Sequence, residues 1–245
     1  MRAITEFRHL KTQRGFTLLE IMIAMSIGLF LLGALMTIVQ TNKAVFINQS
    51  QLAQLQDSER MAMTLMADVI QRAGYFPDPT VNTAGGTLIA SAPFANGQTI
   101  TGAAGDSVSV RYMTAGGDGI LNCSGLSNPV GGANILYVNQ FAVVAGVPSG
   151  QLVCTMNGTP YTLVNGVTNL SVLYGVKTNL AAAGNNVDTY LRASQMTPTN
   201  WNNVITVMVT LTFNNPLFVA AGQGQAPSFT IQRLVNLMNQ SGPAT

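Results

Sequence analysis

A long apolar run lies near the start of the chain. Residues 21–39 are nineteen consecutive uncharged and mostly apolar residues, and the only ionisable side chain between Arg14 and Lys43 is Glu20. As a helix, this run measures about 28 Å at a rise of about 1.5 Å per residue, which is enough to cross the hydrocarbon core of a bilayer. The run therefore predicts a membrane-spanning helix with one carboxylate near its beginning.

The helical pattern continues beyond the apolar run. Residues 34–73 contain no Gly or Pro, and apolar side chains recur on one face at spacings of three, four or seven: Val45, Leu52, Leu55, Ala62, Met66, Val69 and Ala73. Gly74 and Pro77 are typical signals for the end of a helix. We predict one continuous helix over about 16–73, whose second half packs its apolar face on a sheet.

After Pro79 the pattern changes to short strands separated by Gly, Asn and Pro turns. Apolar and polar residues alternate along 107–112 and 205–213, as expected for strands with one buried face. Other segments that suit strands are 134–145, 150–156, 160–164, 167–176 and 229–235. We expect an α+β protein with an antiparallel sheet of six or more strands packed on the helix, and an exposed loop in the Gly-rich stretch 85–105.

Basic residues are concentrated at the N-terminus. Four of the eleven basic residues and one of the nine acidic residues lie within residues 1–15, so the remainder carries seven basic and eight acidic residues. The basic residues that precede the apolar run are Arg2, Arg8, Lys11 and Arg14. The positive-inside rule keeps this end cytoplasmic and sends the body outward. A body so nearly neutral lacks the clustered cations that bind nucleic acid, so no nucleic-acid partner is predicted.

The chain offers few groups for catalysis or metal binding. Its only histidine is His9, which precedes the apolar run, and residues 116–119 are too poor in carboxylates for a metal or phosphate loop. We predict no catalytic residue, no metal and no cofactor, and a protein that is not an enzyme.

Two cysteines, Cys123 and Cys154, stand 31 positions apart in strand-like sequence, with no further Cys or His nearby to complete a metal site. They are either two free thiols or a disulfide. Because the body is expected to be exported, we favour the disulfide, which would stabilise the fold by roughly 3–4 kcal/mol.

The segment before the apolar run has a specific resemblance. Arg14-Gly15-Phe16-Thr17-Leu18-Leu19-Glu20 resembles the signal of type IV prepilins and of type II secretion pseudopilins. An ordinary signal peptide has a shorter apolar region and a small-residue cleavage site, whereas this run passes without a break into more helix. A plain membrane anchor has no reason to carry a carboxylate, which is costly in lipid.

The resemblance implies roles for three residues. A membrane prepilin peptidase would cut between Gly15 and Phe16 on the cytoplasmic side, and the new N-terminal Phe16 would be N-methylated. Glu20 would then be the fifth mature residue, which pairs with the N-terminal amine of a neighbouring subunit during assembly. A carboxylate in lipid must find a counter-charge or become neutral, which agrees with such a role.

The body adds a second resemblance. Four stretches, in order, resemble PilW-type minor pilins: 73–76, 106–112, 165–176 and 201–204. The family implies a pilin-like ladle with a cleaved leader (1–15), a membrane and filament-core half-helix (16–40), an amphipathic half-helix (41–74) and a β-rich globular domain (75–245). The region 177–188 departs from the acidic turn of many relatives because Asp188 is its one acid, so no calcium loop is predicted.

These resemblances imply a minor pilin, a structural subunit of the complex that initiates or caps the type IV pilus. Its implied partners are the prepilin peptidase, other minor pilins, the major pilin and the inner-membrane assembly platform. It would cross the inner membrane once, and then reach the periplasm and the cell-surface pilus. Two alternatives remain open here: a minor pseudopilin of type II secretion, and a tethered adhesin or carbohydrate-binding module with Trp201 and Tyr190 as candidate contacts.

Overall fold

The computed structural model describes residues 15–103, 106–146, 150–218 and 225–240. Two compact units make up the chain, one ending at Ser50 and the other beginning at Gln51. Helix α1, Leu18–Gln71, contributes residues to both units. The α+β class and the long N-terminal helix are therefore confirmed.

The ends of α1 lie two residues inside the predicted range of 16–73. Thr17 precedes the first helical residue, and a turn at 72–74 follows the last one. Gly74 has a φ of +82°, and its N–H donates to the Arg111 carbonyl at 2.9 Å. A Cβ at Gly74 would lie 2.6 Å from side-chain atoms of Thr99 and of Asn239, so both backbone conformation and space require glycine there.

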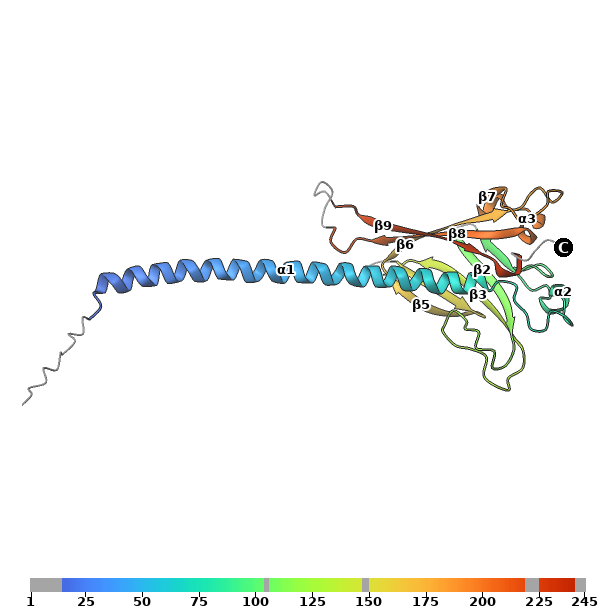
Figure 1. Ribbon diagram of the computed structural model, residues 1–245, viewed down its shortest axis with the longest axis horizontal. Helices are drawn as coiled ribbons and strands as arrows, with labels where there is room; N and C mark the ends of the chain where they lie inside the picture. The colour runs from blue at the N-terminus through green and yellow to red at the C-terminus, as the bar shows by residue number, and fades with distance from the viewer. Residues whose placement is uncertain (1–14, 104–105, 147–149, 219–224, 241–245) are drawn as a thin grey trace, which may run out of the picture. The chain divides into compact units, whose positions relative to one another are not determined.

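In the described part of the second unit, nine strands form two antiparallel sheets (Figure 1). The five-stranded sheet has the order β1-β2-β3-β4-β5, with β1 at Ile100–Ala103, β2 at Ser107–Thr114, β3 at Ile135–Val144, β4 at Gln151–Met156 and β5 at Thr159–Asn165. The four-stranded sheet has the order β7-β6-β8-β9, with β6 at Val167–Val176, β7 at Thr189–Leu191, β8 at Val204–Asn214 and β9 at Ser228–Asn236. Short helices α2, Ala84–Thr87, and α3, Pro198–Asn202, lie in the connections.

The strand segments were predicted well, but the single sheet of six or more strands was wrong. Gly166 is the only residue between β5 and β6, and its φ of +85° turns the chain out of one sheet and into the other. Its N–H donates to the Gly150 carbonyl at 2.9 Å, while its carbonyl accepts from Asn214 N–H at 2.8 Å. Alternation of apolar residues identifies a strand but not its partner, which is why two sheets could not be distinguished from one.

One continuous core joins α1 to both sheets. The buried residues of α1 are Ala62, Met63, Met66, Ala67, Val69 and Ile70. The predicted apolar face is buried only in this last part of the helix, because Leu52 and Leu55 are half-buried and Val45, in the first unit, is exposed. Packing on the sheets therefore uses about the last three turns of α1.

Two expectations about the start of the body were wrong. The stretch 85–105 is not simply an exposed loop, because it contains β1 and the buried side chains of Leu88, Phe94 and Ile100. Strand β2 is buried on both faces rather than one, with Arg111 0% exposed. The guanidinium of Arg111 explains both differences, since it donates hydrogen bonds to carbonyls of residues 88–98 and so draws this segment over β2.

Candidate functional site

The N-terminal candidate site consists of Gly15, Phe16 and Glu20. Gly15 and Phe16 lie in non-helical chain before α1, and the Phe16 side chain is 84% exposed. A Cβ added at Gly15 would meet no atom within 4 Å. Within the part of the chain that the structure describes, no packing contact requires glycine at this position.

Glu20 lies in the first turn of α1 and is held by Thr17. The Glu20 carboxylate accepts hydrogen bonds from the Thr17 N–H at 3.1 Å and from the Thr17 hydroxyl at 3.2 Å. In return, the Thr17 hydroxyl accepts from the Glu20 N–H at 3.3 Å. This reciprocal pattern is a capping box, and it places the carboxylate at the positive end of the helix dipole. We did not single out Thr17 from the sequence, although its Thr-x-x-Glu spacing is the signal that could have identified it.

The first unit presents an apolar helix surface. Its most exposed large apolar side chains include Leu18, Leu19, Met25, Leu29, Phe30 and Leu32. Helix α1 is long and apolar enough to cross a membrane. So large an apolar surface on a helix has to be covered by lipid or by another chain.

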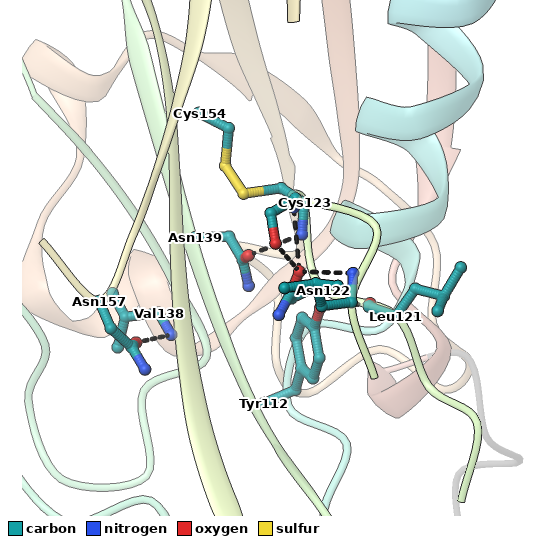
Figure 2. The surroundings of a disulfide bond; sticks show 10 residues. Tyr112, Leu121, Asn122, Cys123, Val138, Asn139, Cys154 and Asn157 are labelled. Atoms are coloured by element: carbon teal, nitrogen blue, oxygen red, sulfur yellow. Dashed lines mark hydrogen bonds between the residues drawn. A yellow bond between two sulfur atoms is a disulfide. The ribbon is translucent and has the colours of Figure 1, made fainter. Parts of the chain in front are cut away.

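The second candidate feature is the disulfide between Cys123 and Cys154, which confirms the predicted pairing. Cys123 belongs to the connection between β2 and β3, and Cys154 lies on β4. Figure 2 shows the bond beside Asn139, whose side-chain oxygen accepts from the Cys123 N–H at 3.1 Å. Both cysteines are at most 1% exposed. The disulfide is thus part of the core of the body and not a surface thiol pair.

Two family models match this chain. Residues 135–235 match the type IV pilus-assembly protein W family, from the first residue of β3 into β9. Residues 10–36 match the prokaryotic N-terminal methylation motif. The predicted resemblance to PilW-type pilins is confirmed. No curated protein and no solved structure gives a significant match.

Both matching families are structural components of pili and not enzymes. The methylation motif and the apolar part of α1 together fit a membrane-anchored pilin, and the PilW-type match indicates assembly with other pilins. Among the described residues, no group of three or more His, Cys, Asp or Glu is placed to hold a metal ion.

The two aromatic residues considered for glycan contact lie within the PilW-type segment. The ring of Trp201 is half-buried and meets the buried ring of Tyr174 edge-to-face at 4.8 Å between centroids. Tyr190 is 38% exposed, and its hydroxyl accepts from the Thr206 hydroxyl at 3.5 Å. Trp201 therefore packs against the core and does not form a flat exposed platform for a sugar ring.

The PilW-type segment also contains the turn after β6, which is organised by Lys177 and Asp188. The Lys177 ammonium donates to the Ala182 carbonyl at 2.6 Å and also to the Gly184 carbonyl. The Asp188 carboxylate accepts from the N–H groups of Asn179 at 2.7 Å and Thr178 at 2.8 Å. These oxygen atoms are engaged within the protein, so the loop is closed by its own side chains.

Asp188→Asn is expected to loosen this turn at neutral pH. Hydrogen bonds from the N–H groups of Asn179 and Thr178 lower the pKa of the Asp188 carboxyl below its ordinary value. A lowered pKa in the folded state means that the ionised group stabilises the turn above the ordinary pKa, and that this support is lost as the pH falls through the lowered value. Hydrogen exchange of the 178–182 amides should accelerate several-fold in the variant at pH 7, with the denaturation midpoint unchanged.

The control for this prediction is Asp118→Asn. Asp118 accepts from the N–H groups of Ala115 and Ile120 in a different turn, so its replacement should affect exchange there and leave residues 178–182 unaltered. Equal exchange at 178–182 in Asp188→Asn and in the wild-type chain would contradict the assigned role.

Proposed function

We propose that this chain is a minor pilin of the type IV pilus, which acts as a non-enzymatic subunit in the complex that initiates or caps the filament. The observation that carries the proposal is the presence of a prepilin methylation motif and a PilW-type segment in one chain. In the proposed organisation, residues 1–15 are removed, 16–40 enter the membrane and then the filament core, 41–74 form the amphipathic half of the helix, and 75–245 form the exported body.

Processing is proposed at the bond between Gly15 and Phe16. The accessible, non-helical chain at these two residues supports cleavage, and the open space around Gly15 among the described residues supports its recognition by a peptidase. Phe16 then becomes the methylated N-terminus. We propose the prepilin peptidase, the major pilin, the other minor pilins and the inner-membrane platform as partners, with the inner membrane and then the surface pilus as locations.

We place the subunit at the tip of the pilus because of the size of its body and the sequence of its helix. The body is large for a repeating subunit and would crowd its neighbours. Residues 16–75 contain no Pro, whereas major pilins commonly carry one in the apolar segment that loosens the helix on assembly. Both features favour a low-copy subunit over the main building block.

Mass spectrometry of sheared surface filaments tests the proposal. We expect a peptide that starts at N-methyl-Phe16, at low abundance relative to the major pilin. Immunogold labelling of the body should mark filament ends. Filaments without any peptide from this chain, in cells that express it, would remove the proposed function, and even labelling along the shaft would remove the tip position.

Glu20→Ala is expected to permit cleavage and methylation but to reduce the chain's incorporation into sheared filaments at least about tenfold. The physical reason is that the carboxylate supplies the counter-charge for the neighbouring subunit's N-terminal amine, for which lipid offers no substitute. Glu59→Ala, which removes an acid of the same helix outside the apolar run, is the matched control and should be incorporated normally. Normal incorporation of Glu20→Ala would refute the role of the carboxylate.

A further inference from the structure

The backbone carbonyl of Leu121 is a meeting point of two elements of the body. It accepts a hydrogen bond from Arg72 Nη1 at 2.9 Å and another from the Tyr112 hydroxyl at 2.8 Å. Arg72 is the residue that directly follows α1, and Tyr112 lies on β2. Both lone pairs of this oxygen are therefore occupied. We call this arrangement of Arg72, Tyr112 and the Leu121 carbonyl the Leu121 junction.

The segment that supplies this carbonyl is fixed two residues later. Cys123 is bonded to Cys154 on β4, and its N–H donates to the Asn139 side chain on β3 at 3.1 Å. Asn139 and Cys154 are 0% exposed. Figure 2 shows the disulfide, Asn139, Leu121 and Tyr112 in one neighbourhood. The position of the Leu121 carbonyl is thus set from the five-stranded sheet through one covalent bond and one buried hydrogen bond.

The connection around Cys123 has little else to hold it by hydrophobic burial. Ile120 is half-buried against the core, but the other large apolar side chains are turned to solvent, with Leu121 42% exposed, Leu126 62% exposed and Val130 92% exposed. A segment with few buried apolar contacts opens at low free-energy cost unless a specific bond restrains it. The disulfide supplies such a restraint at Cys123, and the buried Asn128 amide, which donates to the Thr114 carbonyl on β2 at 3.2 Å, supplies another further along.

We infer that the Cys123–Cys154 disulfide positions the C-terminal end of α1, acting through the Leu121 junction. Without the disulfide, the Leu121 carbonyl moves with its loop, and Arg72 keeps only its ion pair with Asp68 at 2.8 Å, one turn earlier on the same helix. The last turn of α1 then loses its side-chain attachment to the β2–β3 connection, while the backbone bonds of Gly74 and Tyr75 to β2 remain. The sequence carries no signal for this junction, because its acceptor is a backbone atom.

The junction has a consequence for a filament subunit, which rests on the proposed function. A pilin body is attached to its filament through α1, so force on the body reaches the helix through the contacts at its end. Disulfides form in oxidising compartments, so the bond that fixes the Leu121 junction forms after the body has been exported. The subunit then carries a helix end that is firmly joined to the body.

Hydrogen exchange of the full chain in detergent micelles tests the inference. The variants are Arg72→Gln, the pair Cys123→Ala/Cys154→Ala, and their combination. We expect exchange at residues 66–75 to accelerate about tenfold more than exchange in β8, both in Arg72→Gln and in the cysteine pair variant. In the cysteine pair background, Arg72→Gln should add less than twofold, because the junction is already lost. Asp68→Asn, which removes the ion pair and keeps the bond to Leu121, should change exchange at 66–75 less than twofold.

Two results would overturn the inference. One is equal acceleration in β8 and at residues 66–75 on loss of the disulfide, which would mean that the bond acts on global stability alone. The other is an undiminished effect of Arg72→Gln in the cysteine pair background. If the cysteine pair variant does not fold, Tyr112→Phe takes its place and is combined with Arg72→Gln in the same way. Purely additive effects of these two substitutions on exchange at residues 66–75 would overturn the junction. The exchange measurement needs no pilus. The inference about the disulfide can therefore fail while the filament peptide at Phe16 is found, and the proposed pilus function can fail while the exchange results are as expected.

Discussion

Replacing Arg111 by Met should lower the free energy of unfolding of the body by about 4 kcal/mol or more. The Arg111 side chain is 0% exposed, and its guanidinium donates to the carbonyls of Gln98 and Ile89, each at 2.6 Å. It also donates to the carbonyls of Ala95 at 2.7 Å and Leu88 at 3.0 Å. Met would fill most of the volume but satisfy none of these acceptors.

The magnitude follows from the number of acceptors that lose a donor. A buried polar group that loses its partner costs about 1–3 kcal/mol. The Gln98 and Ile89 carbonyls lose the guanidinium donor, whereas those of Leu88 and Ala95 keep a backbone N–H donor and lose only a second, charged one. Loosening of residues 88–98 would admit water to some of these carbonyls, which keeps the summed loss near about 4 kcal/mol. The cation also lies 4.8 Å from the ring centroid of Phe94, and this contact would be lost as well.

Urea denaturation of the full chain in micelles, followed by tyrosine and tryptophan fluorescence, measures the change. Arg111→Lys is expected to recover less than half of the loss, because an ammonium has three donors and lacks the planar fork of the guanidinium. The matched control is Arg192→Met, whose side chain is 58% exposed and 3.8 Å from the Asp106 carboxylate. A change below about 1 kcal/mol for Arg111→Met would show that the 88–98 segment is held by other means.

Removing the disulfide with Cys123→Ala/Cys154→Ala is expected to cost about 3–4 kcal/mol of unfolding free energy. The bond closes a loop with a sequence separation of 31 residues, and loop-closure entropy of the unfolded chain accounts for that amount. Since natural domains are stable by only about 5–15 kcal/mol, this is a large share of the total.

The measurement is the denaturation midpoint with and without reductant. Reductant should move the wild-type midpoint to that of the double variant, whose own midpoint should not respond. Iodoacetamide should label neither cysteine in the native, unreduced chain, because both are buried and bonded. Two labelled thiols, or a double variant as stable as the wild-type chain, would contradict the prediction.

Local patterns were sufficient for the elements of this protein. Helix α1 differs from its predicted range by two residues at each end, and the predicted strand segments correspond to β2 to β6, β8 and β9. Such patterns depend on neighbouring residues along the chain, where the helix and strand periods are directly visible. The short strands β1 and β7 were not predicted, because they have too few residues to show alternation.

Some residues of the candidate sites could also be identified from the sequence, whereas others could not. Gly15, Phe16 and Glu20 lie within one short segment, so the resemblance that assigns their roles could be identified without knowledge of the fold. The pairing of Cys123 with Cys154 followed from there being two cysteines and a predicted export route. The roles of Arg111, Arg72 and the Leu121 carbonyl could not be foreseen, because each depends on which backbone oxygen lies within reach of a side chain.

The sequence by itself determined the long helix, the apolar run that is long enough to span a membrane, the prepilin motif, the PilW-type resemblance and most of the strands. Only the tertiary structure decided the division into two sheets at Gly166, the burial of Arg111 under residues 88–98, and the attachment of the end of α1 to the Leu121 carbonyl. The physical reason is that periodicity and charge are properties of consecutive residues. Strand partners and backbone acceptors, by contrast, are selected by contacts between residues far apart in the chain.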